Sequence, residues 1–384
     1  MAHNLGVDPG GSLNDVRGRL VLGDRVTPGR LVVDDGWIRS IDLDPSAADG
    51  PLIAPGFVDV HVHGWGGHAA TGSDDALSGM ARALLRRGVT SFLPTAPSLP
   101  PEALQRFAER VRRWLPAAPA DGAEPLGFNL EGPFLSPDRR GAHEPTALRL
   151  PRDVEADELD ALVDGLRVIT IAPELPGSLE LIARLAERGV AVSLGHSAAG
   201  LDESRAGFAA GARSTTHLFN AMSGIDHRNP GLAVAALTDD DVYAELIADG
   251  LHVHRALWPL VARAKPVGRL LLVSDALPIA GLGDGDTALG GLAVEVRGGR
   301  ATVAGTSTLA GSVIALDTAV RNLVFAGTPI AAAVAAASDN AATMLGAVDR
   351  GRIEPGRRAH LVELDDDLRV LRVTRGGPWL DASR

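Results

Sequence analysis

The stretch Ala54-Pro-Gly-Phe-Val-Asp-Val-His-Val-His-Gly64 decides the fold class of this chain. Its apolar residues are typical of a fully buried strand. Residues two apart on a strand point to the same side, so His61 and His63 would present both imidazoles to one place. Alone, such a pair is also compatible with histidines that are satisfied inside a core. Other parts of the sequence are needed to distinguish a metal site from buried core histidines.

Further apolar runs follow this strand, and segments of helical period separate most of them. Including the first, the candidate strands lie at 52–62, 89–94, 126–130, 168–172, 190–195, 214–218, 244–248 and 270–274. Helices are predicted at 75–87, 101–114, 179–188 and 202–210, the last with Asp202 as its N-cap. Strands that alternate with helices in this way predict an α/β fold, a (β/α)8 TIM-like barrel. A doubly wound sheet is the alternative, but a nucleotide-binding one would carry a Gly-rich loop where this chain has His-Val-His.

Both ends of the chain carry a different pattern. Short β-rich segments with Gly, Pro and Asp turns lie at 19–22, 29–34 and 37–42, and again at 360–364 and 370–374. They predict a small β-sandwich domain formed by both termini, residues 1–52 and 353–384, beside a barrel of residues 53–352. A β-hairpin turning at Gly298-Gly299 is predicted inside the long loop 281–308.

Composition narrows the classes of function. The chain has 384 residues and a net charge of −11, without the basic footprint that nucleic-acid binding requires. It has no cysteine, so any metal must be held by His, Asp or Glu. Residues 1–8 show no signal-peptide pattern, and no apolar run reaches the ~20 residues of a membrane span. We expect a cytoplasmic protein that binds neither nucleic acid nor membrane.

Ionisable side chains stand at the ends of most predicted strands, where a barrel gathers its functional groups. They are His61, His63, Glu131, His196, His217, Asp249, His252 and Asp275. Burying such groups is costly unless they are paired or bound to metal. The distribution therefore favours a metal site, and imidazole and carboxylate ligands suit Zn, Fe, Mn or Co alike.

Asp275 follows the apolar run 270–273. A lone carboxylate in this place is suited to act as general base toward a metal-activated water. A metal ligand and an N-cap are the alternative interpretations of the same residue.

Several motifs, in this order along the chain, resemble the family of N-acetylglucosamine-6-phosphate deacetylases, within the amidohydrolase superfamily. Beside 54–64, they are Leu130-Glu-Gly-Pro-Phe134, Arg140-Gly-Ala-His143, Gly195-His196, Thr216-His-Leu-Phe-Asn-Ala-Met222, Ala248-Asp-Gly-Leu-His252, Ser274-Asp-Ala276 and Thr308-Leu-Ala-Gly-Ser312. The resemblance runs from about 52 to 364. It implies a metal-dependent hydrolase that converts N-acetylglucosamine 6-phosphate to glucosamine 6-phosphate and acetate.

The resemblance also implies roles for individual residues. Glu131, His196 and His217 would bind the main metal, and His61 and His63 a second one that Glu131 bridges, so the resemblance implies one or two divalent ions per subunit. Asp275 would be the base beside these ligands and would pass its proton to the leaving amine.

Substrate contacts follow from the same resemblance. His252 would help to polarise the acetyl carbonyl, and His143 would line the substrate pocket. Asn220, Ala221 and Arg228 would hold the sugar phosphate.

The phosphate would be held by His227 and Arg228, which can act across a homodimer. A guanidinium suits a phosphate dianion, although a surface arginine is the ordinary interpretation of Arg228 by itself.

The chain departs from the family at Asn129, where members commonly carry a histidine two residues before the glutamate. This difference, together with atypical loops at 64–72 and 229–231, leaves another N-acyl sugar open as the substrate. A related amidohydrolase that acts on cyclic amides or N-acyl amino acids is one alternative. A catalytically inactive sugar-phosphate binding protein is the other, and it predicts the loss of a ligand or base that this chain retains.

Overall fold

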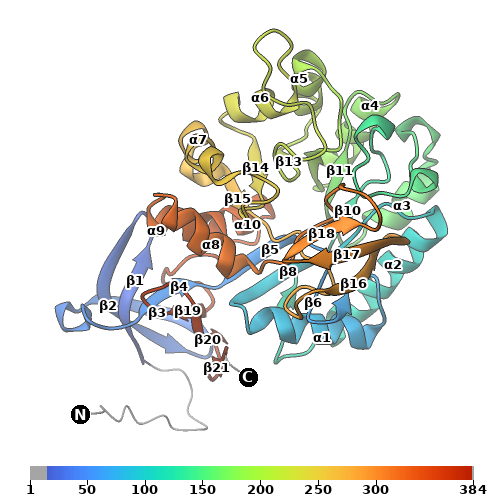
Figure 1. The fold of residues 1–384 in the computed structure, drawn as a ribbon. Helices are drawn as coiled ribbons and strands as arrows, with labels where there is room; N and C mark the ends of the chain where they lie inside the picture. The colour runs from blue at the N-terminus through green and yellow to red at the C-terminus, as the bar shows by residue number, and fades with distance from the viewer. Residues whose placement is uncertain (1–14, 383–384) are drawn as a thin grey trace.

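The computed structural model describes residues 15–382, and its centre is a barrel of parallel strands (Figure 1). The strands follow one another around it in sequence order: β5 (Phe57–Val62), β8 (Val89–Ala96), β10 (Phe128–Glu131), β11 (Leu166–Ile171), β12 (Ala191–Leu194), β13 (Ser214–Thr215), β14 (Tyr243–Leu246) and β15 (Leu270–Leu272). Asp275 N donates to His61 O over 2.9 Å, which joins the chain after β15 to β5. The predicted barrel is confirmed, and the doubly wound alternative is wrong because the first and last strands meet.

A helix follows each barrel strand along the chain. They are α1 (Asp74–Leu85), α2 (Pro101–Trp114), α3 (Ala156–Val163), α4 (Ser178–Glu187), α5 (Leu201–Ala209), α6 (Leu232–Thr238), α7 (Trp258–Ala264) and α8 (Leu316–Phe325). In α2, a proline at the first position starts the helix, and Leu104, Phe107, Val111 and Trp114 recur at helical spacing and are buried.

The predicted N-cap of α5 is wrong. Gly200 caps this helix, and its N–H donates to the Glu203 carboxylate over 2.9 Å, so Asp202 lies in the first turn instead. An acidic residue in the first turn still favours the helix, because it faces the positive end of the helix dipole.

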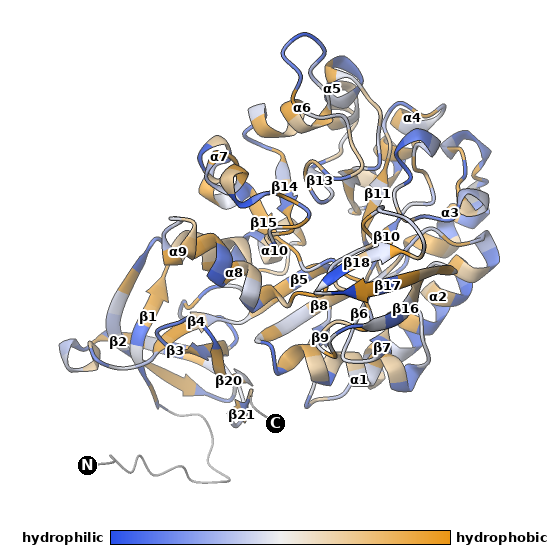
Figure 2. Cartoon of the chain, viewed as in Figure 1, coloured by the Kyte–Doolittle hydropathy of each residue, from blue (hydrophilic) through white to orange (hydrophobic). Residues whose placement is uncertain are grey.

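The hydrophobic core of the barrel is formed by side chains of its strands. Figure 2 shows mainly apolar colours along the central strands and mixed colours on the helices around them. One buried cluster joins Val60 of β5, Leu93 of β8, Val168 of β11 and Leu271 of β15 to Ala341 of α10 (Asp339–Met344). Side chains of several strands thus fill the barrel, as expected for this architecture.

Both ends of the chain form a second sheet, which Figure 1 shows beside the barrel as blue and red strands together. Its order is β21 (Leu380–Asp381), β20 (Val370–Arg375), β19 (His360–Leu364), β4 (Leu52–Pro55), β1 (Asp15–Leu22), β2 (Arg25–Asp34) and β3 (Trp37–Leu43). A bridge from Trp37 of the edge strand β3 to Arg358, just before β19, brings this edge back against the chain that enters the middle of the sheet. The predicted small β domain is therefore confirmed, as one continuous sheet that folds back on itself. The helix α9 (Ile330–Ala336) contacts β1 and β2 of this sheet and also β15 of the barrel.

The strand predicted at 52–62 divides in two. Leu52–Pro55 pairs with β1 and β19 of the terminal sheet, whereas Phe57–Val62 pairs with β8 of the barrel. Gly56 separates them, and a Cβ there would lie 2.3 Å from the Thr90 side chain. The apolar run is continuous because both halves are buried, so hydropathy alone does not reveal the division.

Smaller strands complete the fold. The predicted hairpin forms as β17 (Leu292–Arg297) and β18 (Arg300–Val303), and β16 (Gly285–Leu289) adds a third strand to it. The short strands β6 (Gly64–Trp65), β7 (His68–Ala69) and β9 (Glu124–Pro125) lie in loops of the barrel.

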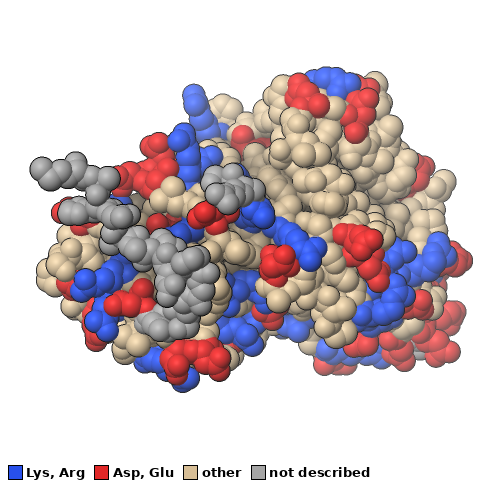
Figure 3. Space-filling view, turned by 90° about the horizontal axis from the view of Figure 1, so that it is seen from below, with Lys and Arg blue, Asp and Glu red and all other residues tan. Residues whose placement is uncertain are grey.

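Charges of both signs are interspersed over the face drawn in Figure 3. Between residues 15 and 382, no helix has the length and apolar character needed to cross a membrane. Residues 1–8, for which no signal peptide is expected, lie outside the described residues.

Candidate active site

The predicted site residues gather at one end of the barrel, because the carboxyl ends of parallel strands lie together. Glu131 is the last residue of β10, and His63 directly follows β5. His196 and His217 follow β12 and β13, and Asp275 follows β15. The side chains are at most 8% exposed.

The backbone is unusual where several strands end. His196, His217 and Asp275 have φ values of 47°, 31° and 49°, in the left-handed region that residues other than glycine rarely adopt. Each such conformation costs on the order of 1–3 kcal/mol and persists only where the surrounding structure enforces it. The side chains of these residues meet others of the cluster, since those of His196 and His217 contact Glu131 and that of Asp275 contacts His63.

Glu131 is the centre of the cluster. Its Oε1 lies 2.8 Å from His217 Nε2 and 3.0 Å from His196 Nε2. Its Oε2 lies 3.2 Å from both His63 Nε2 and His143 Nε2. His61 Nε2 is 3.7 Å from Oε1, so one carboxylate faces five imidazoles.

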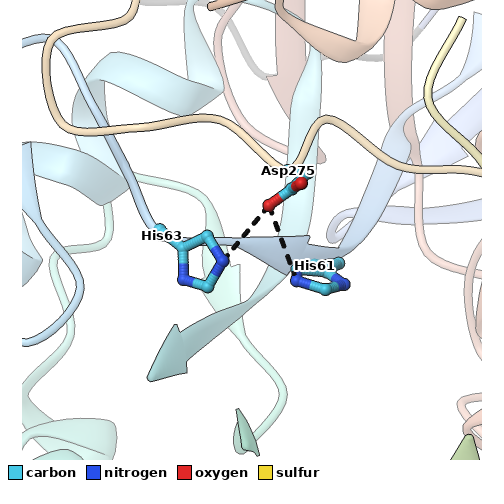
Figure 4. A group of neighbouring side chains, drawn as sticks. All are labelled: His61, His63 and Asp275. Carbon is cyan, nitrogen blue, oxygen red and sulfur yellow. Dashed lines mark ion pairs between the residues drawn. The ribbon is translucent and has the colours of Figure 1, made fainter. Parts of the chain in front are cut away.

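A second group lies beside the first and is drawn in Figure 4. Asp275 Oδ1 is 3.2 Å from His63 Nε2 and 3.6 Å from His61 Nε2. Ligand atoms of these three residues lie within 4.8 Å of one another, and so do those of Glu131, His143 and His196.

The donor atoms fit divalent metal ions. The Nε2 atoms of His196 and His217 lie 3.1 Å apart, and both also face Glu131. His61 Nε2 is buried and has no hydrogen-bond partner among the described residues. Nitrogen lone pairs that converge on a carboxylate in a buried site are typical of Zn, Fe, Mn or Co sites.

The electrostatics of the cluster keep its carboxylates ionised. Burial alone would raise the pKa of Glu131, but the neighbouring imidazoles of His143 and His61 hold it well below its usual range. Burial opposes ionisation of Asp275 too, yet His63 and His61 lower its pKa.

The pKa values of two imidazoles in this cluster shift in opposite directions. Burial would lower the pKa of His63, but hydrogen bonds to Asp275 and Glu131 raise it to about 9. Burial, with His143 and His217 close by, lowers the pKa of His196 to about 4. Neutral His196 therefore has a free lone pair at neutral pH, whereas His63 would release a ring proton when its nitrogen binds a metal ion.

His252 forms a dyad with Asp249 in the loop after β14. The His252 ring contacts Asp249 Oδ2 through Nδ1 over 2.7 Å, and Asp249 Oδ1 accepts the backbone N–H of His252 over 2.8 Å. Because the carboxylate holds the proton on Nδ1, His252 Nε2 is free to act toward the cavity, which His252 lines.

A cavity of about 350 Å³ opens over the cluster. Beside the cluster residues, its walls include Arg139, Ala142, Asn220, Ala221, Leu289 and Leu309. The cavity thus combines a polar floor with walls that are partly polar and partly apolar, which suits a small polar substrate that carries an alkyl group.

His227 and Arg228 do not reach this cavity within the same chain. Both are exposed on the loop before α6, where Asp226 Oδ1 accepts the backbone N–H groups of Arg228 and Asn229 over 2.8 and 2.7 Å. The structure brings together the other predicted site residues and leaves these two outside the lining.

Some residues of the site are not predicted from the sequence. Glu245 of β14 contacts His61, and Arg139 lines the cavity while its carbonyl oxygen accepts from His196 Nδ1. An acidic residue inside an apolar strand is the signal that points to Glu245. Asn129, at the position where family members commonly carry a histidine, donates to Val60 O over 2.9 Å and so ties β10 to β5.

The chain matches the model of the amidohydrolase family over residues 52–380. It is 39% identical over 371 residues to the N-acetylgalactosamine-6-phosphate deacetylase of Escherichia coli O157:H7, covering 90% of this chain and 96% of that protein. It is 40% identical over 375 residues to the human N-acetylglucosamine-6-phosphate deacetylase, covering 89% and 90%.

Solved structures agree with these sequence relatives. The Thermotoga maritima N-acetylglucosamine-6-phosphate deacetylase superposes with a TM-score of 0.89 at 34% identity, over 95% of this chain and 99% of that one. The Mycobacterium smegmatis deacetylase, solved in complex with N-acetyl-D-glucosamine-6-phosphate, gives a TM-score of 0.89 at 36% identity, over 96% and 99%.

Proposed function

The chain belongs to the amidohydrolase family, and from this premise we propose that it hydrolyses the acetamide of N-acetylglucosamine 6-phosphate to glucosamine 6-phosphate and acetate. One observation carries the proposal. A complete cluster of imidazoles and carboxylates lies at the carboxyl end of the barrel, in a chain that is 40% identical to a deacetylase of that substrate.

Two sets of residues would hold divalent ions. Glu131, His196 and His217 form the first set, and His61 and His63 form the second, with Glu131 between them and Asp275 at its edge. When bound, the ions would supply the Lewis acidity that acyl transfer requires. The short distances from Glu131 to His63 and to His217, 3.2 and 2.8 Å, support a shared carboxylate.

Asp275 would move the proton. Its lowered pKa keeps the carboxylate ionised, so it can take a proton from the attacking water and deliver it to the amine that leaves. His252, oriented by Asp249 through Nδ1, would donate a hydrogen bond from Nε2 to the acetyl oxygen in its imidazolium form, in which both ring nitrogens carry a proton.

The cavity walls would hold the sugar. His143, Asn220 and Ala221 line it on the side of the β10 and β13 loops. We further propose a homodimer in which the partner subunit's His227 and the partner subunit's Arg228 reach the phosphate. The exposed loop that carries these residues supports this, since it presents them away from the cavity of their own chain.

N-acetylgalactosamine 6-phosphate is the second candidate substrate. The E. coli relative, at 39% identity over 371 residues, is named for that sugar, which differs only in the configuration at C4. The same cluster would serve both sugars, because the acetamide and the phosphate are common to them.

The test is acetate release from the two sugar phosphates by the metal-replete protein and by the protein stripped with a chelator. We expect faster hydrolysis of N-acetylglucosamine 6-phosphate, loss of activity when the metal is removed, and recovery when a divalent ion is restored. Faster hydrolysis of N-acetylgalactosamine 6-phosphate would make that sugar the preferred substrate instead. Activity that survives the removal of metal would overturn the role given to the cluster.

A further inference from the structure

Glu245 is a buried acidic residue to which the proposed mechanism assigns no role. It lies in β14 between Ala244 and Leu246, and its exposed fraction is 0%. An ionised carboxylate without compensating partners is costly at such a place. Its contacts therefore indicate what it does.

The Glu245 carboxylate joins two ligand sets. Its Oε2 lies 3.2 Å from His61 Nδ1 and accepts the backbone N–H of His217 over 3.2 Å. Its Oε1 has no hydrogen-bond partner among residues 15–382. One oxygen thus connects the ring of His61, on β5, to the chain just after β13.

The outer ring nitrogens of the other histidines have different partners. His63 Nδ1 faces Thr95 O over 3.1 Å, and His196 Nδ1 faces Arg139 O over 2.9 Å. His217 Nδ1 has no partner in the described part of the chain. Of the four histidines proposed as ligands, His61 is thus the one whose outer nitrogen meets a carboxylate within residues 15–382.

A carboxylate on Nδ1 fixes the state of the ring. It keeps the proton on Nδ1, so that the Nε2 lone pair points toward Asp275, whose Oδ1 is 3.6 Å away. A charged acceptor also makes the ring more basic than a carbonyl acceptor does, which strengthens its bond to a metal.

We propose that Glu245 is a positioning residue that orients His61 and thereby sustains the metal site of His61, His63 and Asp275. This inference rests on the proposed metal-dependent function. It predicts that the two ion sites differ in their dependence on Glu245, because the ring nitrogens of His196 and His217 do not contact it.

The experiment measures bound metal rather than turnover. Purified wild type, Glu245→Gln and His61→Gln are loaded with Zn²⁺ and dialysed, and zinc per subunit is determined by elemental analysis. Affinity is measured by competition with a chromophoric chelator. We expect two ions in the wild type, and in Glu245→Gln a loss of affinity at one site by about 10- to 100-fold, the range for lost outer-shell partners.

The double variant tests the route through His61. If Glu245 acts through this ring, adding Glu245→Gln to His61→Gln leaves the affinity of the remaining ion unchanged. Further weakening in the double variant would overturn the proposal, since Glu245 would then act through the His217 backbone. Asp317→Asn is the matched control, because Asp317 is also a buried carboxylate but pairs with Arg87 over 2.7 Å, outside the cluster. We expect it to retain both ions.

Two failures can be told apart. Normal zinc content in Glu245→Gln, with one ion lost in His61→Gln, overturns the role of Glu245 alone. Normal zinc content in His61→Gln as well overturns the second metal site of the proposed function, and the role of Glu245 with it.

Discussion

At the scale of single residues, the site depends on how a few polar groups share one buried space. Glu131 faces His63 and His143 with one oxygen and His196 and His217 with the other. Such a carboxylate cannot be replaced without leaving several imidazoles uncompensated. A substitution is therefore easier to interpret at the edge of the cluster, where Asp275 lies, than at Glu131.

Replacing Asp275 by asparagine tests the proton-transfer role. The amide has nearly the same shape but cannot take a proton, so we expect kcat to fall by about 10²- to 10⁴-fold. The ion proposed at Glu131, His196 and His217 should stay bound, because Asp275 is not one of the residues of that set. Elemental analysis and a steady-state assay on the same sample check both statements. Undiminished turnover in this variant would be incompatible with a general base at position 275.

The sequence predicts where the proposed ligands gather better than it predicts the residues that contact their outer nitrogens. His61, His63, Glu131, His196 and Asp275 stand at strand ends, where a barrel collects its functional groups. Glu245 and Arg139 act on histidines that are distant in sequence, 184 and 57 residues away. Those contacts arise from the closure of the barrel and the path of a loop, which local patterns do not encode.

At the scale of elements, the loop after β18 holds Asp275 in place. Ser312 N donates to Asp275 O over 2.7 Å, and Ser312 Oγ donates to Ser274 O. The preceding Gly311 has a φ of 59°, and a Cβ on it would lie 2.9 Å from Asp275 O. The loop can approach the strand end this closely only because residue 311 has no side chain.

Gly311→Ala should therefore impair both stability and activity. The left-handed backbone alone costs an alanine about 1–2 kcal/mol, and the clash would displace Asp275. Chemical denaturation and kcat are the measurements. Gly299→Ala is the matched control, because Gly299 also has a positive φ of 76° but no atom within 4 Å of its added Cβ. It should lose stability and keep kcat, and an equal loss of kcat in both variants would argue against the clash.

Elements with strong periodic patterns are predicted well, and their junctions less so. The helix predicted at 101–114 has those bounds in the structure, because its apolar spacing is clear and a proline starts it. The run 52–62 is interpreted as one strand but serves two sheets. Both parts of this run are buried, so they have the same apolar character in the sequence. Only their strand partners in the folded protein show that they belong to different sheets.

At the scale of the whole molecule, the terminal sheet and the barrel share buried polar groups. His360 of β19 is 3% exposed, and its carbonyl oxygen accepts the N–H of Gly56 over 2.8 Å. Burial, together with the cationic Arg350 and Arg375, lowers the pKa of His360 to about 3. The folded protein thus keeps this ring neutral at pH values where an unfolded chain would protonate it.

This difference predicts an acid-sensitive stability. Below the ordinary histidine pKa of about 6.5, the unfolded chain binds a proton that the folded state does not. The free energy of unfolding should fall as the pH drops from about 6.5 toward about 3, by at most ~1.4 kcal/mol per pH unit from this group.

Denaturant unfolding at pH values from 7 to 4 measures this effect. His360→Gln should flatten the pH dependence by up to one proton. His227→Gln, at an exposed histidine, should leave the slope as in the wild type. Identical slopes for wild type and His360→Gln would show that this ring is not the acid-sensitive group.

The most direct test of the central claim compares N-acetylglucosamine 6-phosphate with unphosphorylated N-acetylglucosamine, as acetate released by the metal-replete protein. The account predicts a strong preference for the phosphorylated sugar, because both the acetamide chemistry and the phosphate contacts are needed. Equal activity on both sugars, or none on either, would contradict the proposed substrate.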